Sequence, residues 1–250
     1  MKKSVLPLWI LHLVGNALLL WLGYYWLGTS ESDTAHLLWS ALLLIGGVCA
    51  VLWIHGTALV FFDRDQEDGF ARALRTAGRN LLPLLAVAFF AAIVYGLLAY
   101  VYDKFEHNAF LIGSYATMRT RKPVAPQRVL HWYHVLIWIL RWLVVPVFLF
   151  PLTAAVARVG WSGFRLHSFG RSRSILYWAE VCLLLLLAIA VPLRLMNWIP
   201  AFSKFAMQMA SLLGRMGLGY LLFVAALLAI EFLTSRGKPR LSQPNTVASP

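Results

Sequence analysis

The sequence predicts an all-α, polytopic membrane protein with about six transmembrane helices and interfacial amphipathic helices. Of its 250 residues, 60% are hydrophobic and only 13% are charged, whereas a soluble domain needs roughly 25% charged residues on its surface. The apolar residues also fall into six blocks, each near the roughly 20 residues that cross ~30 Å of hydrocarbon. Too few residues are left over to form a sizeable soluble domain.

The six spans belong to one domain, residues 1–235. Each block is apolar all round, as lipid-exposed helices must be. The first block follows Lys2 and Lys3 but is too long for the core of a secretory signal, so we expect it to remain as a span. Residues 236–250 have lost the apolar content, and we expect a disordered tail there. The expected spans lie near residues 7–28, 36–62, 81–102, 135–157, 175–196 and 216–233.

The basic residues indicate the partners and the orientation of the chain. Lys and Arg number 22 against 10 Asp and Glu, and they are dispersed among the spans rather than gathered on one folded surface. This pattern excludes nucleic acid as a partner and favours membrane lipids, especially anionic ones. Six spans put both termini on one side, whose connections carry thirteen Lys and Arg against eight on the other side. We therefore expect both termini in the cytoplasm.

The connection after the second expected span predicts an amphipathic helix. Acidic residues crowd its start, where a helix dipole favours them, and Arg72, Arg75 and Arg79 then recur on one helical face. We expect this helix to lie in the cytoplasmic headgroup layer, with its arginines on lipid phosphates and its apolar face in the acyl boundary. The alternative is a basic linker that only fixes the topology. The predicted apolar face comprises Phe70, Leu74, Ala77 and Leu81.

A second polar stripe lies in residues 128–142. His131, His134 and Arg141 fall close together on a helical projection, so we expect them to contact lipid headgroups. The segment is either a surface helix or the start of the fourth span, with the stripe facing the bundle. The histidines are alternatively metal ligands, but a zinc site needs a third and a fourth ligand, and only His36 and His107 are expected at a similar height. We therefore expect no metal site.

Two histidines lie inside expected spans, where ionisable groups are candidates for function. His12 and His55 are expected ~8 Å and ~10 Å from the cytoplasmic ends of adjacent antiparallel helices, so they can face each other. One interpretation is a pair of haem ligands, or the site of a lipid-modifying membrane enzyme. The other is a set of interhelical hydrogen bonds to Asn16 or to a carbonyl. We expect no cofactor, with haem as the alternative.

The charged residues within spans provide a third class of function. Arg141 and Glu180 are the residues we would assign to a small-molecule or ion transporter. Glu180 and Glu231 are also expected near the cytoplasmic ends of the fifth and sixth spans, where they can form ion pairs with interfacial arginines such as Arg158, Arg171 and Arg173. His-Glu-x-x-His, Gly-x-Ser-x-Gly, P-loop and dinucleotide motifs are absent from the sequence, so it assigns no catalytic residue.

Residues 70–85, FARALRTAGRNLLPLL, lie between two expected spans and carry a resemblance to a known family. They resemble the linker in the six-helix membrane domain attached to some bacterial glycerophosphodiester phosphodiesterases and in related uncharacterised inner-membrane proteins. The similarity covers roughly residues 40–100. It implies a multi-pass protein of the bacterial inner membrane with no assigned chemistry, and we expect no phosphodiesterase catalytic domain.

These observations favour a non-enzymatic protein that binds anionic lipid headgroups or serves as a scaffold for a membrane partner. The arginine stripe Arg72, Arg75 and Arg79 supports this function. The alternatives are the transporter that uses Arg141 and Glu180, and the haem-binding or lipid-modifying enzyme that uses His12 and His55.

Overall fold

The computed structural model describes residues 4–30, 32–63, 69–106 and 108–235 of the chain. It is all-helical, with no strand among those residues, which confirms the predicted fold class. The expected disordered tail, residues 236–250, lies outside the described residues.

Within the described residues, six helical segments are long and apolar enough to cross a membrane, as the sequence predicts. The fourth begins nine residues before the expected start at 135, and the sixth eleven residues before 216, because a helix can continue past the end of an apolar run. The segments are α1 (Leu6–Leu27), α2 (Thr34–Phe61), α4 (Leu81–Glu106), Pro126–Gly163 with α6 (Pro126–Ile139) and α7 (Val145–Val159), Ile175–Asn197 with α8 (Ile175–Leu185) and α9 (Val191–Asn197), and α10 (Phe205–Ser235).

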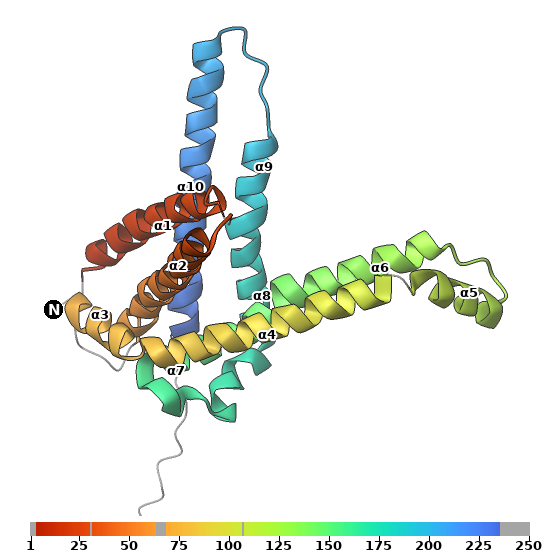
Figure 1. Cartoon of the computed structure of the whole chain (residues 1–250), viewed down its shortest axis with the longest axis horizontal. Helices are drawn as coiled ribbons and strands as arrows, with labels where there is room; N and C mark the ends of the chain where they lie inside the picture. The colour runs from red at the N-terminus through yellow and green to blue at the C-terminus, as the bar shows by residue number, and fades with distance from the viewer. Residues whose placement is uncertain (1–3, 31, 64–68, 107, 236–250) are drawn as a thin grey trace, which may run out of the picture.

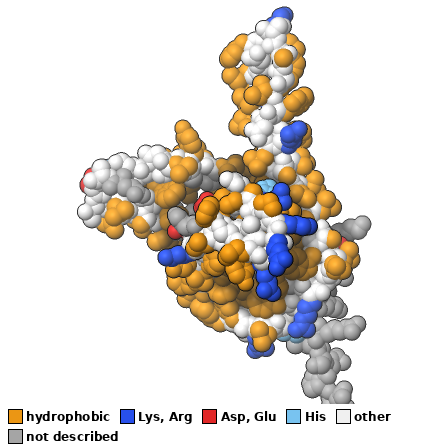
Figure 2. Space-filling view, turned by 90° about the vertical axis from the view of Figure 1, so that its right-hand side faces the viewer, with side chains coloured by type: hydrophobic (Ala, Val, Ile, Leu, Met, Phe, Trp, Pro, Cys, Tyr) orange, Lys and Arg blue, Asp and Glu red, His pale blue; other side chains and the backbone are white. Residues whose placement is uncertain are grey.

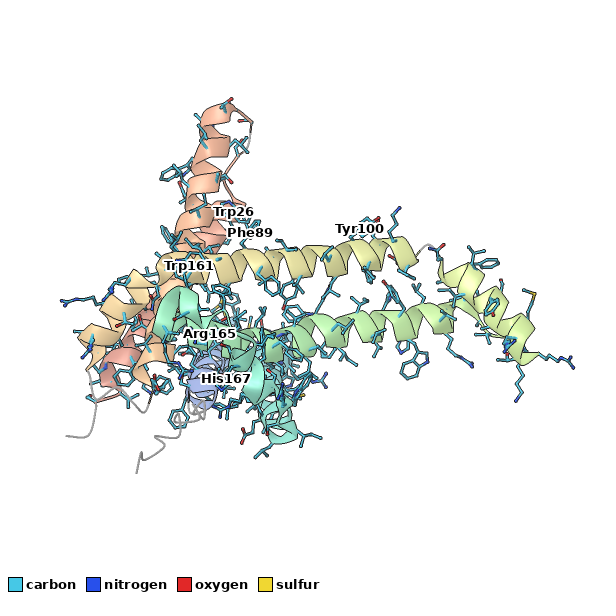
Figure 3. All side chains as sticks on the ribbon, turned by 90° about the horizontal axis from the view of Figure 1, so that it is seen from below. Trp26, Phe89, Tyr100, Trp161, Arg165 and His167 are labelled. Carbon is cyan, nitrogen blue, oxygen red and sulfur yellow. The ribbon has the colours of Figure 1, made fainter. Side chains whose placement is uncertain are left out.

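The six segments form three helical hairpins that point in different directions (Figures 1 and 3). The first hairpin is α1 with α2, the second is α4 with α6 and α7, and the third is α8 and α9 with α10. Only 11% of the most apolar stretch of α2 is buried within the protein, against 33% for α10. The flanks of the hairpins therefore expose apolar side chains over most of their length.

The hairpins meet at one end, which we call the convergent end. It contains the C-terminal ends of α2, α7 and α10 and the N-terminal ends of α1 and α4. A shared core of buried aliphatic side chains joins these helices there, so it fixes how the three hairpins meet. Its members are Leu8, Ala58, Leu59, Val60, Phe61, Ala73, Leu84, Val87, Leu152, Ala154, Val156, Ala157, Val224 and Leu228.

The predicted amphipathic helix is present as α3 (Phe70–Arg79), but its small apolar residues are buried against protein rather than against lipid. Ala73 and Ala77 are buried in the protein, and Trp53 Nε1 of α2 donates a hydrogen bond to the Leu74 carbonyl at 3.0 Å. Two small residues at a spacing of four let α3 approach closely, and Gly56 of α2 faces Ala77. The small face of α3 thus packs on α2 instead of lying in the acyl layer.

At the opposite end of the first hairpin, α2 begins with a side-chain cap. Asp33 is the N-cap of α2, and its side chain accepts hydrogen bonds from the His36 backbone N–H at 2.9 Å and from the His36 ring at 2.7 Å. These hydrogen bonds hold the pKa of Asp33 below its ordinary value. The charged form of the cap is therefore favoured where α2 begins.

The fourth and fifth segments each contain a short π-helix, Leu140–Val144 and Leu186–Ala190. Both stretches are followed by Val-Pro, with the prolines at 146 and 192. Proline has no N–H to donate to the preceding turn, and the helix adjusts locally by widening. The same dipeptide thus has the same effect in two hairpins.

The π-helix of the fourth segment leaves one carbonyl without a backbone donor, and another helix supplies one. In the π-helical pattern the Arg141 carbonyl would accept from Pro146, which has no N–H. Tyr95 of α4 donates its hydroxyl to this carbonyl at 2.9 Å instead. This bond links the two arms of the second hairpin at the point where the helix is irregular.

Candidate functional site

Three ionisable side chains from three helices meet near the convergent end. His12 lies six residues after the start of α1, His55 six residues before the end of α2, and Glu231 four residues before the end of α10. At 1.5 Å per residue these positions are ~9, ~9 and ~6 Å from the helix ends. We call His12, His55 and Glu231 the buried triad.

The geometry of the buried triad centres on the carboxylate. His55 Nδ1 lies 2.5 Å from Glu231 Oε1, and His12 Nε2 lies 3.6 Å from Glu231 Oε2. The two imidazole rings contact each other edge to face, with centroids 5.1 Å apart. Each carboxylate oxygen therefore faces one histidine.

Two members of the triad are buried ionisable side chains. His12 is fully buried, and Glu231 is 6% exposed. His12 Nε2 and Glu231 Oε2 have no hydrogen-bond partner among the described residues, although both atoms are buried. Buried polar atoms without partners are rare in folded proteins, so this pair requires an explanation.

Close helix contacts bring the triad together. Gly15 lies one turn from His12, and a Cβ at this position would come within 2.6 Å of Ile54 Cδ1 on α2. Glycine therefore permits the approach that places His12 against His55. Two hydrogen bonds hold α10 beside this pair: the Tyr220 hydroxyl donates to the Leu13 carbonyl, and Ser235 Oγ donates to the Leu59 carbonyl at 2.9 Å.

The structure brings together the two histidines that the sequence paired and adds Glu231. Among the described residues, Glu231 pairs with His55, whereas Arg158, one of the expected partners, forms an ion pair with Asp63 at 3.5 Å. Sequence reasoning missed the third member because Glu231 follows an apolar run near a predicted interface, where an arginine partner is the ordinary expectation. The available signal was an isolated acid within apolar neighbours at the depth of both histidines.

The contact between the imidazoles bears on the haem alternative. The two rings touch each other directly, and His55 also lies at hydrogen-bond distance from Glu231. A porphyrin held by both histidines would have to lie between the rings. The described arrangement leaves no such slot, so it suits a small ion or a proton better than a haem.

The predicted arginine stripe lies at the same end of the molecule. Arg72, Arg75 and Arg79 are all exposed on α3, whose alanine face is packed on α2. The C-terminal end of α3 is fixed to the second hairpin, because Asn80 Nδ2 donates to the Ala157 carbonyl at 2.8 Å. The protein thus holds the three guanidinium groups on one solvent-facing or lipid-facing surface.

A second basic segment follows α7 at the convergent end. It contains two 3₁₀ helices, Gly160–Gly163 and Leu166–Arg173. Arg165 and His167, which Figure 3 labels, are exposed there, and so is Arg173. Gly160 has a φ of +63°, and a Cβ there would lie 2.9 Å from Asn80 Oδ1. This glycine therefore brings the basic turns against the end of α3.

The tip of the second hairpin carries a separate basic group. Helix α5 (Ala109–Thr120) folds back on α6 there, and Figure 2 shows the tip with Lys and Arg side chains over it. These residues lie at the far end of the hairpin from the convergent end (Figure 1). The exposed basic side chains of the tip are Lys104, Arg119, Arg121, Lys122 and Arg128.

The stripe of residues 128–142 mostly faces α4 rather than a surface. His134 Nε2 lies 3.1 Å from the Tyr102 hydroxyl and 3.8 Å from Glu106 Oε1, and the Arg141 guanidinium lies 5.5 Å from the centre of the Tyr102 ring. His131 alone of the three stripe residues is exposed. Of the two alternatives, a surface helix or an early start of the fourth span, the structure favours the second: the segment is continuous with the fourth span, and His134 and Arg141 face α4.

The residues assigned to transport are not joined in the structure. Arg141 lies in the second hairpin and Glu180 in α8 of the third, and no hydrogen bond or ion pair connects them among the described residues. Glu180 is half-buried. Arg141 Nε is buried without a hydrogen-bond partner in the part of the chain that is described.

Comparison with known proteins adds no relative to these observations. No family model, curated protein or solved structure matches the chain. The resemblance of residues 70–85 to the phosphodiesterase-associated membrane domain stays a prediction. The six apolar helices identify the chain as a multi-pass membrane protein, and its more specific function has to be argued from the sites above.

Proposed function

We propose that this protein is a non-enzymatic membrane protein that binds anionic lipid headgroups at its convergent end. The observation that supports the proposal is the division of α3 into a buried alanine face and an exposed arginine face. A basic side chain near an anionic membrane surface contributes ~1 kcal/mol of attraction. Three such side chains on one short helix concentrate this attraction at one place, where lipid phosphates can bind.

The packing of α3 supports a preorganised site. The helix is held by the Trp53 hydrogen bond to the Leu74 carbonyl and by the Asn80 hydrogen bond to the Ala157 carbonyl. Guanidinium groups on a fixed helix lose less conformational freedom on binding than groups on a flexible linker. Arg165 and Arg173 on the neighbouring 3₁₀ turns add positive charge at the same end.

The location is part of the same proposal. The predicted topology puts both termini on the side whose connections carry thirteen of the Lys and Arg, which favours a cytoplasmic position for that side. The bacterial inner membrane is the location that the resemblance of residues 70–85 implies. A role as a scaffold for a membrane partner stays a prediction.

The test compares two triple variants of the full chain that remove the same charge. Arg72→Gln, Arg75→Gln and Arg79→Gln together alter α3, whereas Arg119→Gln, Arg121→Gln and Lys122→Gln alter the exposed tip. Each protein is exchanged into vesicles of phosphatidylcholine with phosphatidylglycerol, and the retained lipids are counted by native mass spectrometry. We expect the α3 variant alone to lose its preference for phosphatidylglycerol.

Two results would contradict the proposal. If the α3 variant retains phosphatidylglycerol as the unmodified protein does, the arginine stripe is not the site. If both variants lose the preference equally, net charge rather than α3 determines lipid binding.

A further inference from the structure

The buried triad contains a combination of groups that is costly inside a membrane protein. An ionised carboxylate away from water must be paired and hydrogen-bonded, and Glu231 has only one oxygen at hydrogen-bond distance from a partner. The second oxygen faces His12 Nε2 at 3.6 Å, which is too long for a hydrogen bond. Two buried polar atoms thus lie 3.6 Å apart, each without a hydrogen bond among the described residues.

The three side chains offer a donor set that fits a metal ion. One ligand atom from each of His12, His55 and Glu231 lies within 4.8 Å of the other two. Ligand bonds of 2.0–2.1 Å in a tetrahedral site put neighbouring donors about 3.3 Å apart. His55 approaches Oε1 at 2.5 Å and His12 approaches Oε2 at 3.6 Å, so side-chain rotations that separate His55 from Glu231 and draw the two histidines toward one ion would give this spacing.

We propose that His12, His55 and Glu231 bind one divalent first-row transition-metal ion, with Zn²⁺ as the probe. Two imidazoles and a carboxylate suit Zn²⁺ and its first-row neighbours, whereas Ca²⁺ and Mg²⁺ take oxygen ligands. The ion neutralises the buried carboxylate and satisfies both partnerless atoms together. The sequence predicted no metal site, because the third ligand lies 176 residues from His55 in the chain.

The surroundings of the triad are those of a metal site. Asn16 Nδ2 lies 3.5 Å from His12 Nδ1, so the other ring nitrogen, Nε2, is the one that faces the carboxylate. The same amide nitrogen donates to the His12 carbonyl at 2.9 Å, which holds the Asn16 side chain beside the ring. The His55 side chain is 22% exposed, so the triad is not sealed on every side.

Three protein ligands leave one position of a tetrahedral site open to water or to a substrate. This is the feature that separates catalytic zinc sites from structural ones. The inference goes beyond the proposed lipid-binding function and does not depend on it, because none of the three α3 arginines belongs to the triad.

The test measures metal bound to the full chain, purified in mild detergent through a tag without histidines. Metal content as purified is determined by mass spectrometry, and Zn²⁺ affinity by competition with a chelator after metal removal. We expect about one ion per chain, and an affinity at least ~10-fold weaker in Glu231→Gln and in His55→Gln. His36→Gln is the matched control, because His36 is an exposed histidine of α2 at its opposite end.

Two further measurements keep the proposal falsifiable where a variant folds poorly. Co²⁺ added to the unmodified protein must give the visible absorption of a four-coordinate site. Glu231→His, which replaces one ligand with another, must restore the binding that Glu231→Gln loses.

A different set of results would overturn the proposal. It fails if the unmodified protein takes up no Zn²⁺, if Co²⁺ gives only the spectrum of the hydrated ion, or if Glu231→Gln binds as tightly as His36→Gln. The metal site can also be tested separately from lipid binding. We expect Arg72→Gln, Arg75→Gln and Arg79→Gln together to leave Zn²⁺ binding unchanged.

Discussion

Two polar clusters of this protein contain similar residues in different surroundings. The buried triad joins two histidines and a glutamate from two hairpins, and its central atoms are inaccessible. The hairpin cluster, Tyr102, Glu106, His134 and Arg141, lies within the second hairpin, and the His134 and Glu106 side chains are each 40% exposed. Water or lipid headgroups can therefore complete the hydrogen bonds of His134 and Glu106, but not those of His12 Nε2 and Glu231 Oε2, which are buried.

The comparison shows that residue type alone does not indicate a site. His134 and Glu106 lie 3.8 Å apart and need no further partner, because exposed ion pairs contribute little and lose little when they separate. His12 and Glu231 lie at a similar distance, 3.6 Å, but are buried. At nearly the same distance, the exposed pair can form hydrogen bonds with water, whereas the buried pair cannot.

The largest expected effect comes from removing one partner in each cluster. His55→Ala leaves the buried Glu231 carboxylate without its hydrogen bond, and we expect a loss of about 3 kcal/mol in the free energy of unfolding. His134→Ala should cost less than about 1 kcal/mol, because its partners are half exposed. Unfolding by denaturant in detergent micelles measures both. Equal losses would show that the burial difference has no energetic consequence.

The second prediction concerns the contact that brings the triad together. Gly15→Ala places a Cβ against Ile54 Cδ1, and we expect a loss of about 1–2 kcal/mol together with weaker Zn²⁺ binding. Gly23→Ala in the same helix is the matched control, because nothing lies within 4 Å of the added Cβ. That variant should be as stable or slightly more stable. A stable Gly15→Ala protein with unchanged Zn²⁺ affinity would contradict the close-approach argument.

The smallest effect is expected in the second hairpin. Tyr95→Phe removes the hydroxyl that donates to the Arg141 carbonyl, where Pro146 offers no N–H. We expect a loss of about 1 kcal/mol, the usual value for one hydrogen bond, without a change in Zn²⁺ affinity. Thermal unfolding and the chelator competition measure the two quantities. An altered metal affinity would mean that the two clusters are coupled, although they lie in separate hairpins.

Local patterns in the sequence were sufficient to predict several features. The six apolar blocks predicted six spans, and the spacing of Arg72, Arg75 and Arg79 predicted the amphipathic helix. These predictions hold because each depends on neighbouring residues alone: apolar length for a span and a period of 3.6 for a helix face. The pairing of His12 with His55 was also accessible, since both depths can be counted along consecutive helices.

Other features required the arrangement of the helices. The sequence did not predict that Ala73 and Ala77 pack on α2, because an apolar helix face can bury itself in lipid or in protein. It also did not predict the π-helix at Arg141, although the Val-Pro dipeptide follows both π-helices of this protein.

The sequence by itself determined that this is an all-α membrane protein, how many apolar helices it has and which face of α3 is basic. Only the tertiary structure decided that Glu231 joins His12 and His55, and that His134 and Arg141 face α4. The physical reason is that helix formation and membrane insertion depend on local composition, whereas contacts between helices depend on close packing at a few small residues such as Gly15 of α1 against α2 and Gly56 of α2 against Leu84 of α4.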